Sequence, residues 1–168
     1  EDAIIKVYAD GNENVYRVYR VNLYKLPPLN DIDGMRRYPV AEVTASEVPQ
    51  EQNGTENVID EDLNTRWAAE GTEGQWITLE LDDYYPIEKI GVSWMNGNSR
   101  TTKYKLEISN DGVNWTEIFN GASSGTTNEV EYTSAGGAKA KYVRCTGYGN
   151  SANNWNSVTE FVVLGNQR

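Results

Sequence analysis

The sequence lacks histidine altogether and contains a single cysteine in 168 residues. Histidine is the commonest general base and the commonest transition-metal ligand, so its absence excludes Ser-His-Asp triads, Cys-His pairs and histidine-based zinc sites. One cysteine cannot form an internal disulfide. Cys145 follows Val143 by two positions in an alternating run, which predicts a small buried side chain and not a catalytic thiol.

Long apolar runs and an excess of positive charge are also missing. No run approaches the roughly 18 residues that a membrane span requires. The chain carries 15 Lys and Arg against 25 Asp and Glu, a formal net charge of −10, which opposes electrostatic attraction to nucleic acids and anionic membranes. We therefore expect neither as a partner. No apolar leader stands at Glu1, and we expect any signal peptide of a secreted protein to have been removed already.

Short alternating runs bounded by Gly, Asn, Asp and Pro recur along the chain and are typical of an all-β sandwich or barrel. Half-buried antiparallel strands are expected over residues 76–81, 90–94, 104–108, 129–132, 141–146 and 158–164. The sequence Asn110-Asp111-Gly112 predicts the turn of a hairpin that returns through Trp115 and Ile118. The fold class is therefore all-β.

The first 25 residues predict a two-stranded hairpin, formed by Ile4–Tyr8 and Val15–Tyr24. An isolated hairpin is marginally stable, so it either packs on the main domain or ends an upstream domain, and we favour the second. Pro27, Pro28 and Pro39 predict a linker. The expected organisation is a hairpin over residues 1–25, a linker over 26–40 and a β-sandwich over 41–168.

An acidic segment at residues 57–67 is the most specific stretch of the sequence. Asp60, Asp62 and Thr65 provide hard oxygen atoms close together, and turn carbonyls can complete the ligand set that Ca²⁺ prefers. The alternative is an acidic surface turn, because the spacing is not that of an EF-hand.

Several motifs resemble the discoidin, or coagulation factor 5/8 type C, fold, and specifically carbohydrate-binding module family 32. They occur in the family's order within residues 41–165: Ala45-Ser46, residues 59–67, 74–77, 104–112 with Trp115, 142–144, 147–151 and 155–160. The resemblance implies a discoidin-like jelly-roll β-sandwich, here with an N-terminal β-hairpin extension.

The resemblance also implies a structural calcium ion where the acidic loop meets the C-terminal strand. Its ligands would be the side chains of Asp60, Thr65 and Glu160 and the carbonyl oxygens of Asn57, Asp62 and Thr159. One position departs from the family pattern: Glu61 stands where the family usually has Gly, and Glu lacks the freedom of Gly to adopt a positive φ.

Sugar binding requires flat aromatic faces together with amides, carboxylates and guanidinium groups that meet hydroxyls. The loops at residues 67–74, 96–103 and 147–156 supply this mixture. The candidate carbohydrate contacts are Glu70, Arg100, Tyr148, Asn150 and Trp155. The Arg100 guanidinium suits the carboxylate of a uronic acid. The alternatives are a solvated loop charge for Arg100 and a loop anchor for Trp155.

The resemblance therefore implies a non-catalytic carbohydrate-binding module of a secreted bacterial enzyme, similar to modules attached to alginate lyases. Its expected partners are an acidic oligosaccharide, recognised at a chain end, and a catalytic domain in the same parent chain. The alternatives are neutral galactose-type glycans, a cell-adhesion discoidin domain, or a small lyase or glycosidase with paired carboxylates. The polar loop tips at residues 96–99 and 150–154 argue against membrane insertion.

Overall fold

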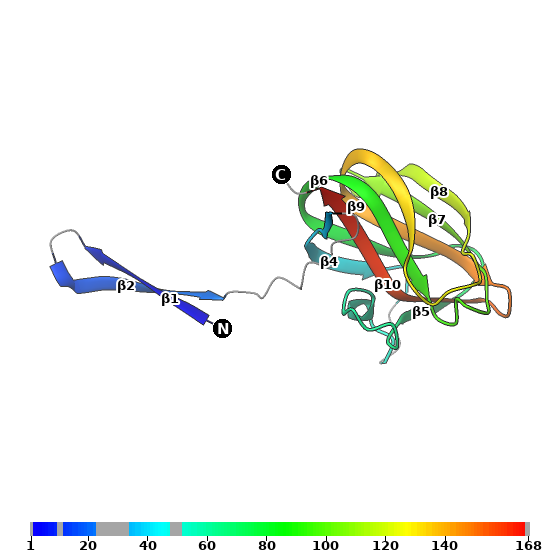
Figure 1. The fold of residues 1–168 in the computed structure, drawn as a ribbon, viewed down its shortest axis with the longest axis horizontal. Coiled ribbons are helices and arrows are strands. Elements are labelled where there is room, and N and C mark those ends of the chain that lie inside the picture. Colours follow the sequence, from blue (N-terminus) through cyan, green and yellow to red (C-terminus); the bar gives the residue numbers. More distant parts are fainter. Residues whose placement is uncertain (1, 10–11, 23–33, 48–51, 167–168) are drawn as a thin grey trace. The chain divides into compact units, whose positions relative to one another are not determined.

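The computed structural model describes residues 2–9, 12–22, 34–47 and 52–166 (Figure 1). The chain divides into two units, Glu1–Asn30 and Asp31–Arg168. In the first unit, β1 (Asp2–Ala9) pairs antiparallel with β2 (Asn12–Asn22). The predicted two-stranded hairpin is thus confirmed, although residues 10 and 11 between its strands lie outside the described residues.

The second unit is an antiparallel β-sandwich. Its elements are β3 (Met35–Arg37), β4 (Val40–Ala45), the 3₁₀ helix η1 (Thr55–Val58), β5 (Trp67–Glu70), β6 (Gln75–Trp94), β7 (Thr102–Ser109), β8 (Thr116–Ala122), β9 (Glu131–Asn150) and β10 (Trp155–Asn166). The strands follow the order β3-β10-β6-β9-β7-β8, with β4 on β6 and β5 on β10. The predicted all-β class is confirmed. No helix in the described part of the chain is long and apolar enough to cross a membrane.

Two long strands connect the layers of the sandwich. The first half of β6 pairs with β4 and its second half pairs with β10 (Figure 1). Its register with β9 shifts between Glu80 and Tyr85. The strands expected over residues 76–81 and 90–94 are therefore the two ends of one bent strand, and β9 likewise includes most of the two strands expected over 129–132 and 141–146.

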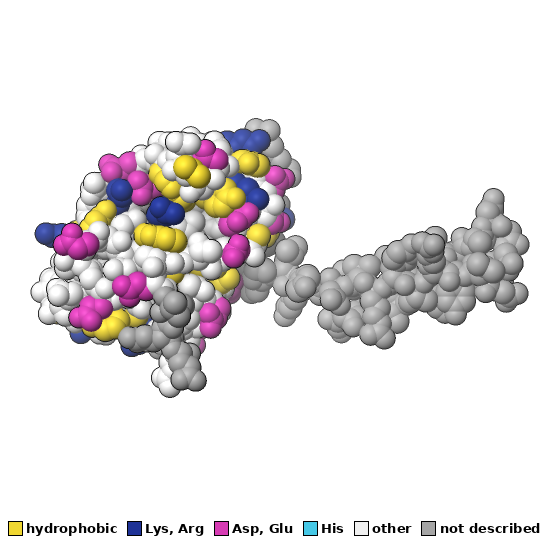
Figure 2. Space-filling model, turned by 180° about the vertical axis from the view of Figure 1, so that it is seen from behind, with side chains coloured by type: hydrophobic (Ala, Val, Ile, Leu, Met, Phe, Trp, Pro, Cys, Tyr) yellow, Lys and Arg dark blue, Asp and Glu magenta, His cyan; other side chains and the backbone are white. Residues whose placement is uncertain are grey.

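The core lies between the layers, where alternate residues of each strand meet. Ile77, Leu79 and Leu81 on β6 are fully buried, as their spacing predicts. Cys145 is also buried, and this burial raises the pKa of its thiol well above the usual range. The prediction of a small buried side chain at this position is confirmed. Outside the core, on the face seen in Figure 2, acidic side chains are spread over the surface and hydrophobic ones form small separate patches.

The sandwich begins earlier in the chain than the sequence suggested. Arg37 of β3 pairs with Leu164 of β10. The ring of Tyr38 stacks on that of Tyr85, with centroids 4.1 Å apart. The backbone N–H of Tyr38 donates to the carbonyl of Val163 over 2.9 Å. The prediction of a linker over residues 26–40 is thus wrong from Met35 onward, and residues 26–33 lie outside the described part. A proline such as Pro39 is compatible with edge strands, where its missing N–H costs no ladder hydrogen bond.

Candidate functional site

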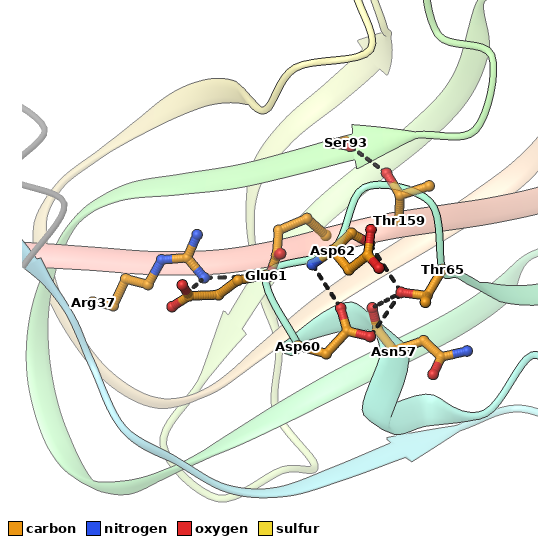
Figure 3. A network of polar contacts seen from close by, with 9 residues as sticks. Arg37, Asn57, Asp60, Glu61, Asp62, Thr65, Ser93 and Thr159 are labelled. Carbon is orange, nitrogen blue, oxygen red and sulfur yellow. Dashed lines mark hydrogen bonds and ion pairs between the residues drawn. The ribbon is translucent and has the colours of Figure 1, made fainter. Parts of the chain in front are cut away.

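The acidic loop brings three oxygen atoms close to the hydroxyl of Thr65 (Figure 3). Thr65 Oγ1 lies 2.7 Å from Asp60 Oδ2, 2.9 Å from the carbonyl oxygen of Asp62 and 3.5 Å from that of Asn57. A hydroxyl has one proton, so it cannot donate to all three oxygens at once. The hydroxyl of Thr65 therefore lies among more acceptor oxygens than its one proton can serve.

The backbone of the loop is held by its own carboxylates. The N–H of Asp62 donates to Asp60 Oδ1 over 2.9 Å. Asp62 Oδ1 accepts the N–H of Asn64 and its Nδ2, over 2.9 and 2.7 Å. These hydrogen bonds lower the pKa of Asp62, because they stabilise the ionised carboxylate. The carboxylate of Asp62 thus shapes the turn, while its carbonyl faces Thr65.

Glu61 adopts the backbone conformation that a glycine would take at this position. Its φ is +65°, in the left-handed region that is unfavourable for residues with a Cβ. Its carboxylate lies 3.7 Å from Nη1 of Arg37 on β3 (Figure 3). The turn therefore keeps a positive φ at this position, although Glu61 stands where the family usually has Gly.

A buried carboxylate accompanies this loop. Glu160 on β10 is 1% exposed, and its Oε1 lies 3.3 Å from Nη1 of Arg37. Burial raises the pKa of Glu160 to about 7, and Asp60 and Glu61 add to this effect while Arg37 opposes it. Next to it in the chain, Thr159 is buried and its hydroxyl is hydrogen-bonded to Ser93. The Arg37 guanidinium thus bridges Glu61 and Glu160.

The donor set of the loop can be compared with what a metal needs. Among the described residues, no three Asp, Glu, Cys or His side chains are close enough to hold an ion by themselves. A cation here would take part of its ligands from hydroxyl and carbonyl oxygens. Hard oxygen donors of mixed type are what Ca²⁺ accepts, so the residues present fit a calcium ion.

A separate pocket lies over the strand pair β5–β10. Ala68 is opposite Ser157, and Glu70 is opposite Trp155. Ala68 and Ser157 both line a hollow with a volume of about 340 Å³. Its lining consists of Asn53, Arg66, Ala68, Met95, Asn96, Arg100, Asn153, Trp155 and Ser157. None of these described lining residues is acidic.

The loop that carries Arg100 is fixed by backbone hydrogen bonds. The N–H of Met95 donates to the carbonyl of Ser157 over 3.0 Å, which ties the start of the loop to β10. Asn96 has a φ of +57°, and its carbonyl accepts the N–H groups of Ser99 and Arg100, both over 3.0 Å. The backbone at Arg100 is therefore positioned before any ligand arrives.

The turn between β9 and β10 is shaped by Asn150. Its Nδ2 donates to the carbonyl of Trp155 and to Oδ1 of Asn153, both over 2.7 Å. Its Oδ1 accepts the N–H groups of Ala152 and Asn153 over 2.9 and 3.1 Å. The amide of Asn150 is thus occupied within the turn that presents Trp155 and Asn153 to the pocket.

The structure brings two of the five predicted carbohydrate contacts into the pocket, Arg100 and Trp155. Glu70 is exposed and lies beside the pocket, opposite Trp155. Asn150 lies inside the turn, and Tyr148 is half-buried against Gly74 without lining the pocket. The calcium set is brought together in part, since Asp60, Thr65 and the carbonyls of Asn57 and Asp62 converge.

The remaining lining residues were not named as contacts, although Ala68, Asn96 and Asn153 lie in the loops that were expected to form the site. Arg66 lies outside those loops and is the most informative of these residues. The sequence did indicate on which side of the chain Arg66 lies. Trp67 is 1% exposed and belongs to the core. Because neighbouring residues of an extended segment point to opposite sides, Arg66 and Ala68 face away from Trp67, and there Arg66 is half-buried and Ala68 is buried.

Comparisons with known proteins agree with this architecture. The family model of the F5/8 type C domain matches residues 42–161. The structure described as "CBM32 of AlyQ in complex with 4,5-unsaturated mannuronic acid" is 40% identical, with a TM-score of 0.71, and the match covers 76% of this chain and 96% of that one. A pectin-binding carbohydrate-binding module is 32% identical, with a TM-score of 0.69 and coverage of 75% and 91%.

A longer relative contains a similar domain. Truncated AlyQ, with CBM32 and alginate lyase domains, is 39% identical with a TM-score of 0.74. The match covers 80% of this chain but 34% of the AlyQ chain, so this chain spans about a third of that protein. The sequence profile, the sandwich and these neighbours together show that the chain belongs to the F5/8 type C domain family and is a non-catalytic carbohydrate-binding module of family 32.

Proposed function

We propose that this module binds the ends of acidic, alginate-type uronate oligosaccharides in the pocket over β5 and β10. One observation carries the proposal: in a protein with a net charge of −10, Arg100 and Trp155 line a pocket whose described lining has no acidic residue. Screening over a Debye length of about 8 Å at physiological salt leaves local charges in control of binding.

The lining supplies the groups that a uronate needs. A guanidinium pairs with a carboxylate through two parallel hydrogen bonds, and an indole ring stacks on the apolar face of a sugar. Asn96, Asn153 and Ser157 offer amide and hydroxyl groups for sugar hydroxyls. A volume of about 340 Å³ lies at the lower end of the range for small-molecule sites, which suits a chain end. The similar module bound to 4,5-unsaturated mannuronic acid supports this ligand class.

We also propose that the module belongs to a secreted polysaccharide lyase. The AlyQ relative contains a CBM32 and an alginate lyase domain in one chain. A weakly binding module linked to a catalytic domain raises the effective substrate concentration at that domain. In this arrangement, the module works outside the cell and contributes affinity without chemistry.

Structural calcium is the third element of the proposal. The side chains of Asp60, Thr65 and Glu160 and the carbonyls of Asn57, Asp62 and Thr159 are its proposed ligands. When bound, Ca²⁺ supplies a positive charge that offsets these oxygens. Asn57 also donates its Nδ2 to the carbonyl of Arg66 over 2.8 Å, so the same loop supports the pocket wall. Chelation should lower the melting temperature, and an unchanged melting curve in EDTA would contradict the proposal.

Titration calorimetry with uronate oligomers and with neutral galactosides tests the ligand class. Wild-type protein should bind the uronates, and Arg100→Ala should lose most of this binding with little change in melting temperature. Lys139→Ala is the matched control, because it removes the same charge at an exposed position of β9 outside the pocket. A preference for neutral galactosides, or normal uronate binding by Arg100→Ala, would refute the uronate assignment.

A further inference from the structure

We infer that Arg66 is a second carboxylate-binding residue, and that the pocket recognises two successive uronates and not only the terminal one. The inference rests on the proposed function, since it concerns the same pocket. Arg66 and Arg100 come from different segments and line one cavity. Among the residues that the structure describes, neither guanidinium is held by a hydrogen bond or an ion pair.

Arg37 and Arg144 contrast with this pair, whereas Arg36, whose Nε also has no partner, does not line the pocket. Arg37 bridges two carboxylates. Arg144 donates its Nε to Thr78 and lies 4.4 and 3.9 Å from the ring centroids of two tryptophans. In both cases the protein itself satisfies the guanidinium. Arg66 and Arg100 keep their donors for something outside the protein, and an anionic ligand is the group that they suit.

The backbone register places Arg66 and Trp155 toward opposite ends of the pocket floor. Ala68 is paired with Ser157, both of which line the pocket, and Trp155 is paired with Glu70. Arg66 directly precedes β5, and four residues of extended chain separate its backbone from that of Glu70, a distance of about 13 Å along the strand. This separation exceeds the width of a single sugar ring. A terminal sugar that stacks on Trp155 therefore leaves Arg66 to the next sugar of the chain.

The backbone of Arg66 is held in place by contacts with the rest of the domain. Its carbonyl accepts the Asn57 Nδ2, and the next residue, Trp67, is buried in the core. The backbone is thus fixed on both sides while the guanidinium remains available. Such preorganisation reduces the entropy lost when a ligand is bound. Arg66 is accordingly a specificity-determining residue, which distinguishes a chain of uronates from a single uronate.

The test is titration calorimetry with a uronate monomer, dimer and trimer, and with a dimer whose second carboxyl group is reduced to an alcohol. Wild-type protein should bind the dimer more tightly than the monomer and lose this gain for the reduced dimer. Arg66→Ala should weaken dimer binding by about tenfold, as expected for a lost charge-assisted contact, and leave monomer binding within about twofold. Arg66→Lys should recover part of the gain, and Lys139→Ala should behave as wild type.

The outcomes separate this inference from the proposed function. Wild-type protein that binds no uronate of any length would refute both. Wild-type protein that binds uronates, with an Arg66→Ala variant that keeps the full gain for the dimer, would refute the inference alone. An equal loss for monomer and dimer in Arg66→Ala, with an unchanged melting temperature, would also overturn it, because Arg66 would then contact the terminal sugar.

Discussion

Without calcium, the stability of the sandwich should fall as the pH rises from 4.5 to about 7, because Glu160 must ionise inside the folded protein. The folded pKa is raised above that of the unfolded chain, so the native state binds more protons in this window. Unfolding free energy then decreases with increasing pH. One unit of pKa corresponds to about 1.4 kcal/mol, so the total loss should be about 3 kcal/mol.

Few other groups obscure this titration. The chain has no histidine, the usual side chain that titrates in this range. The pKa values of Asp62 and Asp111 are lowered, so these carboxylates contribute at lower pH. The perturbed tyrosines and lysines have raised pKa values and contribute at higher pH. Glu160 therefore dominates the window.

Urea unfolding at pH 5, 6, 7 and 8, with EDTA or with calcium, measures the effect. With calcium the fall should disappear, since a cation beside Glu160 favours the ionised carboxylate. Glu160→Gln should remove the pH dependence in EDTA, because the amide does not titrate, and should also reduce stabilisation by calcium. Equal stability of the metal-free protein at pH 5 and pH 8, or an unchanged pH dependence in Glu160→Gln, would refute the reasoning.

Three further changes test other parts of the structure. Ala68→Leu places a larger side chain in the pocket lining and should weaken uronate binding by more than about tenfold, at a cost of about 1–3 kcal/mol in stability because Ala68 is buried; normal affinity in calorimetry would contradict the pocket assignment. Arg144→Gln removes the cation between two tryptophan rings and should cost about 1–2 kcal/mol in urea unfolding without affecting binding. A chain starting at Asp31 should keep the melting temperature of the whole protein. A chain starting at Pro39 should melt several degrees lower, because it loses β3 and the contacts of Arg37 and Tyr38. Equal melting temperatures of the two chains would show that β3 is dispensable.

Features formed by residues close in sequence were predictable. The alternation of Ile77, Leu79 and Leu81 indicates a half-buried strand wherever the strand is placed, since side chains alternate across the backbone. Asp60 and Thr65 lie within one turn, so their spacing alone brings their oxygens together, and the structure has them 2.7 Å apart. The family motifs extended this local reasoning to the sandwich as a whole.

The partners that a polar side chain binds were less predictable. Asn150 has the right chemistry for a sugar hydroxyl, but its amide is engaged in four hydrogen bonds of its own turn. Pro39 suggested a linker, but the chain on either side of it forms edge strands. In both cases residue type indicates what a group can do, while its neighbours determine what it does.

The sequence by itself determined the all-β class, the family and the acidic loop, because these depend on periodicity and on contacts within a few residues. Only the tertiary structure decided the pocket, since its lining comes from loops and strands far apart in the chain, and two lining residues, Ala68 and Ser157, meet only because β5 pairs with β10. The same holds for Glu160, whose raised pKa arises from burial and from carboxylates about 100 positions away. Burial and long-range register are properties of the packed sandwich, and no local pattern encodes them.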